Sequence, residues 1–203
     1  MKLSEFEKDV LREIGNMGAS YSANSLSEIM NKKVEIRVPD FDVLPLEEFP
    51  NVVGGGEEIV AGILVKFNGD ISGYLMLFYQ LKYALNLADL LLGKEFGTTK
   101  ELDEMDISAI QEVGNIMASS FANAIADFLK LKITPTPPAF TVDMAGALLN
   151  YLVAELGQTA EKAIFFYTDF IIPPNEILGH LFLSPDEKSL KVIFDKIKEV
   201  MIE

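Results

Sequence analysis

The chain repeats one segment of its own sequence, and this repeat constrains the fold more than any other feature. Residues 9–39 align without a gap with residues 108–138, at an offset of 99 positions. The identical pairs are Glu13/Glu112, Gly15/Gly114, Asn16/Asn115, Ala19/Ala118, Ser20/Ser119, Ala23/Ala122, Asn24/Asn123, Lys33/Lys132 and Pro39/Pro138. A core does not require a Glu-x-x-Asn spacing or a proline 23 residues after the Asn, yet both recur. The repeat predicts two copies of one helix-bearing unit.

Both copies are predicted to begin a helix at the same register. Ser4 with Glu7, and Asp103 with Asp106, each place a capping acceptor three residues before an acid. At about 100° per residue, each helix then buries one apolar face and presents polar side chains to solvent on another. The polar faces carry Asp9, Glu13 and Asn16 in the first copy, and Ser108, Glu112 and Asn115 in the second.

Composition limits the classes of partner and compartment. The net charge is −14 over 203 residues, without a basic run, which argues against nucleic acid and against an anionic membrane surface as partners. There is no cysteine, so the chain has neither disulfides nor thiolate metal sites. The N-terminus is acidic and amphipathic, and no apolar run approaches the length of a membrane span. These features predict a soluble cytoplasmic protein.

The remaining elements follow from alternation and breakers. A loop without regular structure is expected through Pro45, Pro50 and Gly54-Gly55-Gly56. The expected strands are Val34–Val38, Ile59–Phe67, Gly73–Tyr79, a segment near Lys132–Thr134, Ala163–Ile171 and Ile177–Leu183; the expected helices are Lys82–Leu92, stopped by Gly93, and a last helix opened by Ser184-Pro185-Asp186-Glu187.

A helical insert at Met144–Leu156 makes the two halves unequal. One apolar arc holds Met144, Leu148, Tyr151 and Leu152, and Leu149, Val153 and Leu156 widen it beyond what contact with one sheet would cover. Either the insert is core, covered by the neighbouring repeat helix, or part of its surface is a docking site for a partner.

Few residues support hydrolytic or acid–base catalysis by the chain alone. His180 is the only histidine, and its place in a predicted strand favours a packed or half-exposed imidazole. The three consecutive glycines lack the strand and helix flanks of a phosphate-binding loop. Asn24 and Asn123 lie further along the two helices, where an interhelical hydrogen bond is the favoured role. This leaves the Glu-x-x-Asn pairs as the candidate site.

An exposed Glu and Asn three residues apart are ordinary surface in one copy, but their retention in both copies favours a function. An Asn amide does not titrate, so it is neither a general base nor a nucleophile, but its hydrogen bonds can orient a water molecule. A carboxylate one turn away can hold a cationic residue of a partner. Such a site is incomplete alone, since a partner must bring the electrophile and its metal.

The doubled motif resembles a known family. Asp9-x-x-x-Glu13-x-x-Asn16 with Pro39, and Ser108-x-x-x-Glu112-x-x-Asn115 with Pro138, resemble the twin signature of the CheC branch of the CheC/CheX/FliY chemotaxis phosphatases. The resemblance implies an α+β fold in layers with pseudo-two-fold symmetry, a six-stranded, mainly antiparallel sheet and two long motif-bearing helices. It implies one domain, residues 1–203, made of two repeats of about residues 1–98 and 99–203.

The resemblance also implies an activity and partners. The family dephosphorylates the aspartyl phosphate of the response regulator CheY, with Mg²⁺ carried by CheY and no cofactor of its own. Glu13 and Glu112 would pair with a lysine of CheY, and Asn16 and Asn115 would orient the attacking water. Asp9 and Ser108, which open the two motifs, are predicted partner contacts.

A second partner and a rival function complete these expectations. The family implies binding of the receptor deamidase CheD after the second motif proline, which places it at the insert. The predicted contacts there are Asp143, as a mimic of the deamidase's substrate side chain, with Met144, Leu148, Tyr151 and Leu152. The rival function is a non-enzymatic adaptor that sequesters CheY or CheD.

Overall fold

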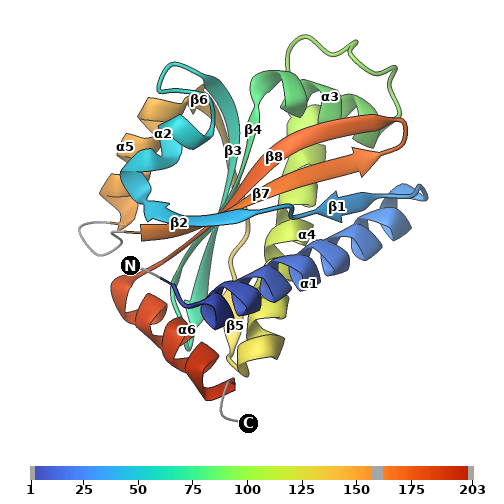
Figure 1. The fold of residues 1–203 in the computed structure, drawn as a ribbon. Coiled ribbons are helices and arrows are strands. Elements are labelled where there is room, and N and C mark those ends of the chain that lie inside the picture. The colour runs from blue at the N-terminus through green and yellow to red at the C-terminus, as the bar shows by residue number, and fades with distance from the viewer. Residues whose placement is uncertain (1–2, 157–161, 201–203) are drawn as a thin grey trace.

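The computed structural model describes residues 3–156 and 162–200 (Figure 1). Its helices are α1 (Glu5–Met30), α2 (Phe49–Val52), α3 (Leu81–Leu92), α4 (Glu104–Leu129), α5 (Ala145–Leu156) and α6 (Glu187–Val200), with a 3-10 turn, η1 (Leu46–Glu48), before α2. Its strands are β1 (Glu35–Arg37), β2 (Phe41–Pro45), β3 (Ile59–Gly69), β4 (Gly73–Gln80), β5 (Ile133–Pro135), β6 (Ala139–Met144), β7 (Lys162–Ile172) and β8 (Asn175–Pro185). The expected α+β class and the two long repeated helices are confirmed.

The strands form one sheet, and every strand pairing in the described residues is antiparallel. Eight strand segments fill six positions across it, in the order β1/β2, β7, β8, β4, β3 and β5/β6. Each edge position holds two short segments, because β1 and β2 both pair with β7, and β5 and β6 both pair with β3. The six strands that the resemblance implies therefore correspond to six positions, of which the two edges are each divided.

The two halves of the chain exchange their edge strands. β1 and β2 come from the first half and pair with β7 of the second, while β5 and β6 come from the second half and pair with β3 of the first. The central pair, β4 and β8, joins one hairpin from each half. Each half thus completes the sheet of the other.

The repeated prolines lie where the edge strands are divided. Arg37 pairs with Asp169 and Phe41 with Phe166, so four residue steps along the edge match three along β7. On the opposite edge, Pro135 pairs with Phe67 and Ala139 with Leu64, which gives the same mismatch. One extra residue in an edge strand is a bulge, and bulges at edges are where a sheet accepts proline. Both divisions contain a repeated proline, Pro39 in one and Pro138 in the other.

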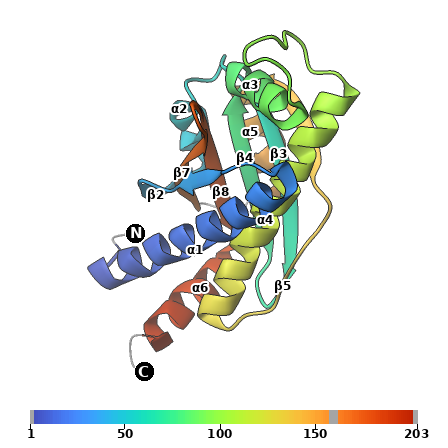
Figure 2. The ribbon, with the colours of Figure 1, turned by 90° about the vertical axis from the view of Figure 1, so that its right-hand side faces the viewer.

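Helices cover both faces of the sheet (Figures 1 and 2). One face packs against α1, α4, α3 and α6 in the larger core cluster, and the opposite face packs against η1, α2 and α5 in a smaller one. α1 and α4 cross and contact each other within the first layer (Figure 2). Four aromatic rings pack edge-to-face or tilted in the smaller core, with contacting centroids 4.3–5.2 Å apart: Phe49, Phe78, Phe165 and Phe182.

The two long helices begin and end alike. Both predicted capping boxes are formed, Ser4 with Glu7 on α1 and Asp103 with Asp106 on α4. Each helix spans 26 residues and ends at a left-handed residue, Asn31 or Lys130. Among the helix stops predicted from the sequence, Gly93 after α3 is confirmed by its positive φ. The register of the repeat is therefore set locally, by caps at both ends.

Four local expectations are wrong. The predicted loop through Pro45 and Pro50 contains β2, η1 and α2. α6 begins at Glu187, where Asp186 accepts a hydrogen bond from the Ser189 N–H, while Ser184 is buried in β8. Asn24 and Asn123 are both exposed, and neither side chain forms an interhelical hydrogen bond among the described residues. Met144 ends β6, so the helical insert starts one residue later than expected.

Candidate functional site

The motif residues lie on the outer surfaces of α1 and α4. Glu13 and Asn16 are exposed on α1, Glu112 is exposed on α4, and Asn115 is partly buried. The opening residues of the motifs, Asp9 and Ser108, are exposed as well. The structure brings each Glu and Asn to the same exposed helix face, as the periodicity predicts.

The glycine before each Asn holds its helix against the sheet. A Cβ on Gly15 would lie 3.1 Å from the Phe166 ring and 3.3 Å from Val38. A Cβ on Gly114 would lie 2.5 Å from Ile63, a distance that no real Cβ contact allows. Each glycine lets the helix backbone approach the sheet closely, and in the first copy the next residue, Asn16, lies beside the edge strand β1.

Asn16 and Pro39 line one shallow groove between α1 and β1. Ser20 contributes from the helix, and Glu35 and Arg37 contribute from the strand. The fixed distance from Asn to proline in the sequence thus corresponds to one surface site, formed where the bulged edge strand passes the helix. The repeated proline was visible in the sequence, but the sequence did not show that this proline lies next to the Asn in the fold.

The two helices that carry the motifs contact each other directly. A Cβ on Gly18 would lie 2.6 Å from the Phe121 ring, so the helix crossing is as close as this glycine permits. Met117 and Ala118 are buried on the α4 side of this layer. Because the crossing is rigidly packed, the two candidate sites are held in a fixed relation to one another.

The four motif side chains form no polar interactions with other described residues of the chain. Among residues 3–156 and 162–200, no hydrogen bond or ion pair engages the side chains of Glu13, Asn16, Glu112 or Asn115. Asp9 differs, since its carboxylate accepts from Arg12 at 2.7 Å. The same described residues contain no cluster of three or more His, Cys, Asp or Glu side chains placed to hold a metal ion. A carboxylate and an amide without intramolecular partners can bind a group that comes from outside the chain.

The predicted partner contacts of the insert separate into two groups. Asp143, Met144 and Tyr151 are exposed, whereas Leu148 and Leu152 are buried at 6% and 3% exposure and pack in the smaller core. Val153 is also exposed, and the side chain of Leu156 lies outside the described part of the chain. One side of α5 is therefore core, but the sheet, η1 and α2 cover it, and the expected cover by a repeat helix is wrong because α1 and α4 lie on the opposite face of the sheet. Another side of α5 faces solvent, and docking of a partner there stays a prediction.

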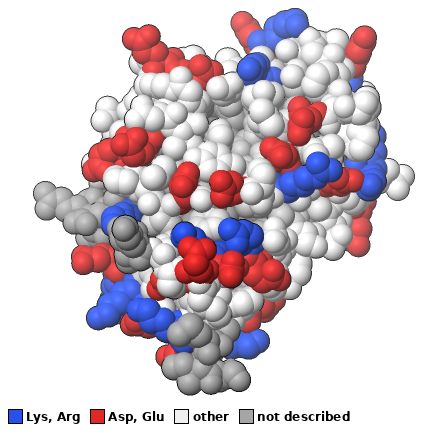
Figure 3. All heavy atoms as spheres, viewed as in Figure 1, with Lys and Arg blue, Asp and Glu red and all other residues white. Residues whose placement is uncertain are grey.

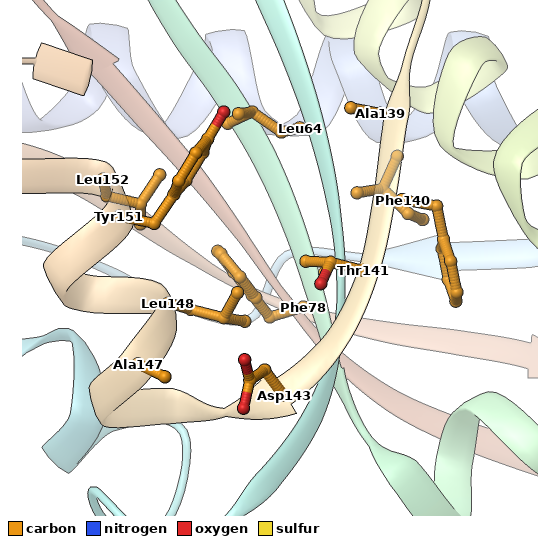
Figure 4. Close-up of a pocket in the computed structure, with 12 residues that line it drawn as sticks. Leu64, Phe78, Ala139, Phe140, Thr141, Asp143, Ala147, Leu148, Tyr151 and Leu152 are labelled. Carbon is orange, nitrogen blue, oxygen red and sulfur yellow. The ribbon is translucent and has the colours of Figure 1, made fainter. Parts of the chain in front are cut away.

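A cavity of about 260 Å³ lies between α5 and the edge of the sheet (Figure 4). Phe78, Leu148 and Leu152 form much of its apolar wall, while Asp143, Thr141 and Tyr151 bring polar atoms to it. Four of the five contacts predicted at the insert thus line one concave site, in which Met144 does not take part.

The sequence analysis missed residues beside the first motif. A second groove runs between the start of α1 and β2, and its helix side is lined by Glu5, Lys8 and Arg12. The signal was available, because positions 8 and 12 do not match their counterparts 107 and 111 in the repeat.

No helix within the described ranges combines the length and apolar character needed to cross a membrane.

Comparison with known proteins places these features in one family. The profile of the CheC-like family matches residues 6–42 and 105–142, which are the two motif helices with their edge strands. The chain is 33% identical over 199 residues to the CheY-P phosphatase CheC of Bacillus subtilis, with 95% of this chain and 94% of that protein aligned.

Two solved structures share the fold. The crystal structure of Thermotoga maritima FliY matches with a TM-score of 0.80 at 23% identity, covering 98% of this chain and 99% of that one. The CheX–CheY–BeF3–Mg²⁺ complex from Borrelia burgdorferi matches with a TM-score of 0.52 at 18% identity, covering 85% and 98%. With the repeat, the site geometry and a relative aligned over nearly its whole length, the chain belongs to the CheC-like family.

Proposed function

We propose that this protein hydrolyses the aspartyl phosphate of the response regulator CheY at two sites, Glu13/Asn16 and Glu112/Asn115. The observation that supports this most directly is that both copies carry a Glu and an Asn at the surface of a helix with no hydrogen-bond or ion-pair partner among the described residues. The relative that matches over 95% of this chain is a CheY-P phosphatase, and a CheX structure of the same fold was solved with CheY.

Each side chain has a distinct part in the proposed reaction. The glutamate holds a lysine of CheY and so fixes the orientation of docking. The asparagine, one turn along the helix, reaches beside the phosphoryl group and orients the attacking water by hydrogen bonds. The Mg²⁺ belongs to CheY. Phosphoryl transfer leaves little covalent work for the protein, so positioning accounts for the rate increase.

The decay of phosphorylated CheY tests this proposal and its rival. With catalytic amounts of this protein, a phosphatase gives many turnovers, whereas an adaptor that sequesters CheY gives at most a stoichiometric effect. Asn16→Ala combined with Asn115→Ala should lower the rate about a hundredfold or more, since the water loses its orientation. The thermal unfolding midpoint should stay nearly unchanged, because neither side chain forms a hydrogen bond within the described residues and neither is fully buried. Wild-type turnover in the double variant would disprove the water-orienting role.

We also propose that CheD docks at Asp143, Met144 and Tyr151. Two of these exposed residues flank an apolar cavity, and a concave apolar site with few polar groups is a favourable place for a partner's anchoring side chain. Replacing Asp143 and Tyr151 by Ala should abolish CheD binding in a pull-down with purified proteins while phosphatase activity persists. Native CheD affinity in this folded variant would move the docking site elsewhere.

A further inference from the structure

The first site continues into a groove whose walls are charged. The helix side of the groove carries Glu5, Lys8 and Arg12, and the strand side carries Asp40 and Asp42. Basic and acidic atoms alternate over the face of the molecule that α1 and β2 occupy (Figure 3). The groove is thus a mixed-charge surface.

This groove adjoins the first site on both of its sides. Arg12 immediately precedes Glu13 on α1, and Asp40 follows Pro39, which lines the groove of Asn16. Arg12 and Asn16 are four residues apart on one helix face, so a partner bound at Asn16 lies next to the groove of Arg12 and Asp40.

The charges in the groove are available to a partner. Arg12 pairs with Asp9 at 2.7 Å and Lys8 with Glu5 at 2.8 Å, but the basic side chains remain 53% and 43% exposed. Exposed ion pairs of this kind contribute little to stability, so they exchange partners easily. Asp42 is less available, because its carboxylate accepts a hydrogen bond from the Tyr167 hydroxyl at 2.9 Å.

The second copy lacks this surface. At the offset of 99, the charged positions 5, 8, 12, 40 and 42 correspond to Glu104, Ile107, Gln111, Ala139 and Thr141, of which only the first is charged. Two of these replacements, Ala139 and Thr141, line the apolar cavity under α5. The motif is duplicated, but the surface beside it is charged in one copy and mostly uncharged in the other.

We propose that Lys8, Arg12 and Asp40 form a specificity-determining surface of the first site, which recognises charged side chains around the phosphoryl group of the regulator. The second site has no such surface and recognises the regulator without it. This inference rests on the function proposed above. It predicts that the two sites differ in their dependence on ionic strength, because charges at the rim of an interface act on association and are screened by salt.

Variants with one intact site separate the two contributions. Asn115→Ala leaves the first site and Asn16→Ala leaves the second. Between about 50 mM and about 500 mM salt, kcat/KM for phosphorylated CheY should fall about tenfold through the first site and about twofold through the second. The same titration of binding to beryllofluoride-loaded CheY gives an independent slope that does not require turnover.

Exchanging residues between the copies tests the assignment. Arg12→Gln with Asp40→Ala, added to Asn115→Ala, installs the second copy's residues and should flatten the salt dependence to that of the second site. Gln111→Arg with Ala139→Asp, added to Asn16→Ala, should steepen it. Each exchange leaves the net charge unchanged, so a changed slope reports local charge. A matched control is Lys82→Gln with Glu95→Gln, two exposed residues in α3 and in the segment that follows it, which should leave the slope unaltered. α3 lies at the opposite end of the molecule from the start of α1 (Figure 1).

The outcomes distinguish this inference from the proposed function. Equal salt slopes at the two sites, or slopes that do not respond to the exchange, overturn the inference even if both sites hydrolyse the phosphate. If no variant hydrolysed the phosphate but the salt dependence of binding still changed with the exchange, the phosphatase proposal would be rejected and the specificity-determining surface would stand. Urea unfolding of each variant confirms that it is folded.

Discussion

In the first half of the molecule, α1 leaves Asn16 exposed; in the second half, α4 keeps Asn115 partly buried. α4 contacts α1, α3 and α6, and its Gly114 lies closer to the sheet than Gly15 does. Yet both halves keep the helix length, the caps, the glycine and the proline bulge. The shared parts are those that place a Glu and an Asn at the helix surface, while the surroundings of each site have diverged.

The largest expected difference between the halves concerns the aspartate at the ninth residue of α3 and of α6. Asp89 is fully buried and accepts hydrogen bonds from the N–H groups of Gly97, Thr98 and Thr99 in the segment that joins the halves. Asp195 is exposed, with Lys198 3.9 Å away. Asp89→Ala should lower the free energy of unfolding by about 3 kcal/mol, because several hydrogen bonds to a carboxylate are lost.

Asp195→Ala is the matched control for that change. It should shift the free energy of unfolding by no more than about 0.5 kcal/mol, as exposed substitutions usually do. Urea denaturation of both variants measures the difference. If the two variants were equally stable, the linker would not be held by Asp89.

The buried Asp89 should also affect how the free energy of unfolding depends on pH. Burial alone would raise the pKa of Asp89, but hydrogen bonds from Thr99, Gly97 and Thr98 hold the pKa below its ordinary value. A carboxyl with a lowered folded-state pKa stabilises the fold above its unfolded pKa of about 3.9 and loses this contribution as the pH falls through the folded value. Asp89→Asn should therefore flatten the decline of unfolding free energy below about pH 4, measured by urea denaturation at several pH values. A decline as steep as in the wild type would assign acid sensitivity to other carboxyls.

Alanine substitution of the two motif glycines should also affect stability unequally, but the difference should be smaller than that between the two aspartates. Alanine at position 114 forces the β-branched side chain of Ile63 to move, and overpacking of this kind costs about 1–3 kcal/mol. Alanine at position 15 meets Phe166 and Val38 at distances that need shifts of a few tenths of an ångström. Because alanine favours a helix over glycine by about 1 kcal/mol, Gly15→Ala should be nearly neutral while Gly114→Ala remains destabilising. Equal urea midpoints would show that α4 is no more tightly packed than α1.

Much of the architecture could be predicted because its signals are local. The capping acids and the glycine at position 93 each act within a few residues. The segment from Pro45 to Val53 could not, since its prolines suggested a loop. Pro45 ends β2, and Pro50 sits in the first turn of α2, where no backbone N–H is needed. Burial of Leu46 and Phe49 against the sheet then decides the structure.

The site shows the same limit. The repeat predicts Glu13, Asn16, Glu112 and Asn115 as the candidate site, and helical periodicity predicts that each Glu and Asn share one helix face. The pairing of β1 and β2 with β7, and with it the shared groove of Asn16 and Pro39, joins segments more than a hundred residues apart. No pattern within one segment contains that information.

The smallest predicted effect concerns His180 of β8, which follows Gly179 as Tyr74 follows Gly73 in β4. Its Nδ1 is buried without a hydrogen-bond partner among the described residues, its ring stands edge-on to Tyr167, and burial lowers its pKa. A histidine with a lowered folded-state pKa binds its proton more readily in the unfolded chain. The free energy of unfolding should therefore decline as the pH falls below the unfolded pKa of about 6.5.

His180→Gln should reduce this decline, because glutamine does not titrate. Urea unfolding between about pH 5 and about pH 8 measures it, and the effect should be smaller than that of Asp89→Ala. Since the imidazole lies on the sheet face opposite α1 and α4, the change should leave phosphorylated CheY turnover at pH 8 unaffected. An unchanged pH slope in the variant would assign the decline to other groups, and a loss of turnover would connect this face of the sheet to the motif helices.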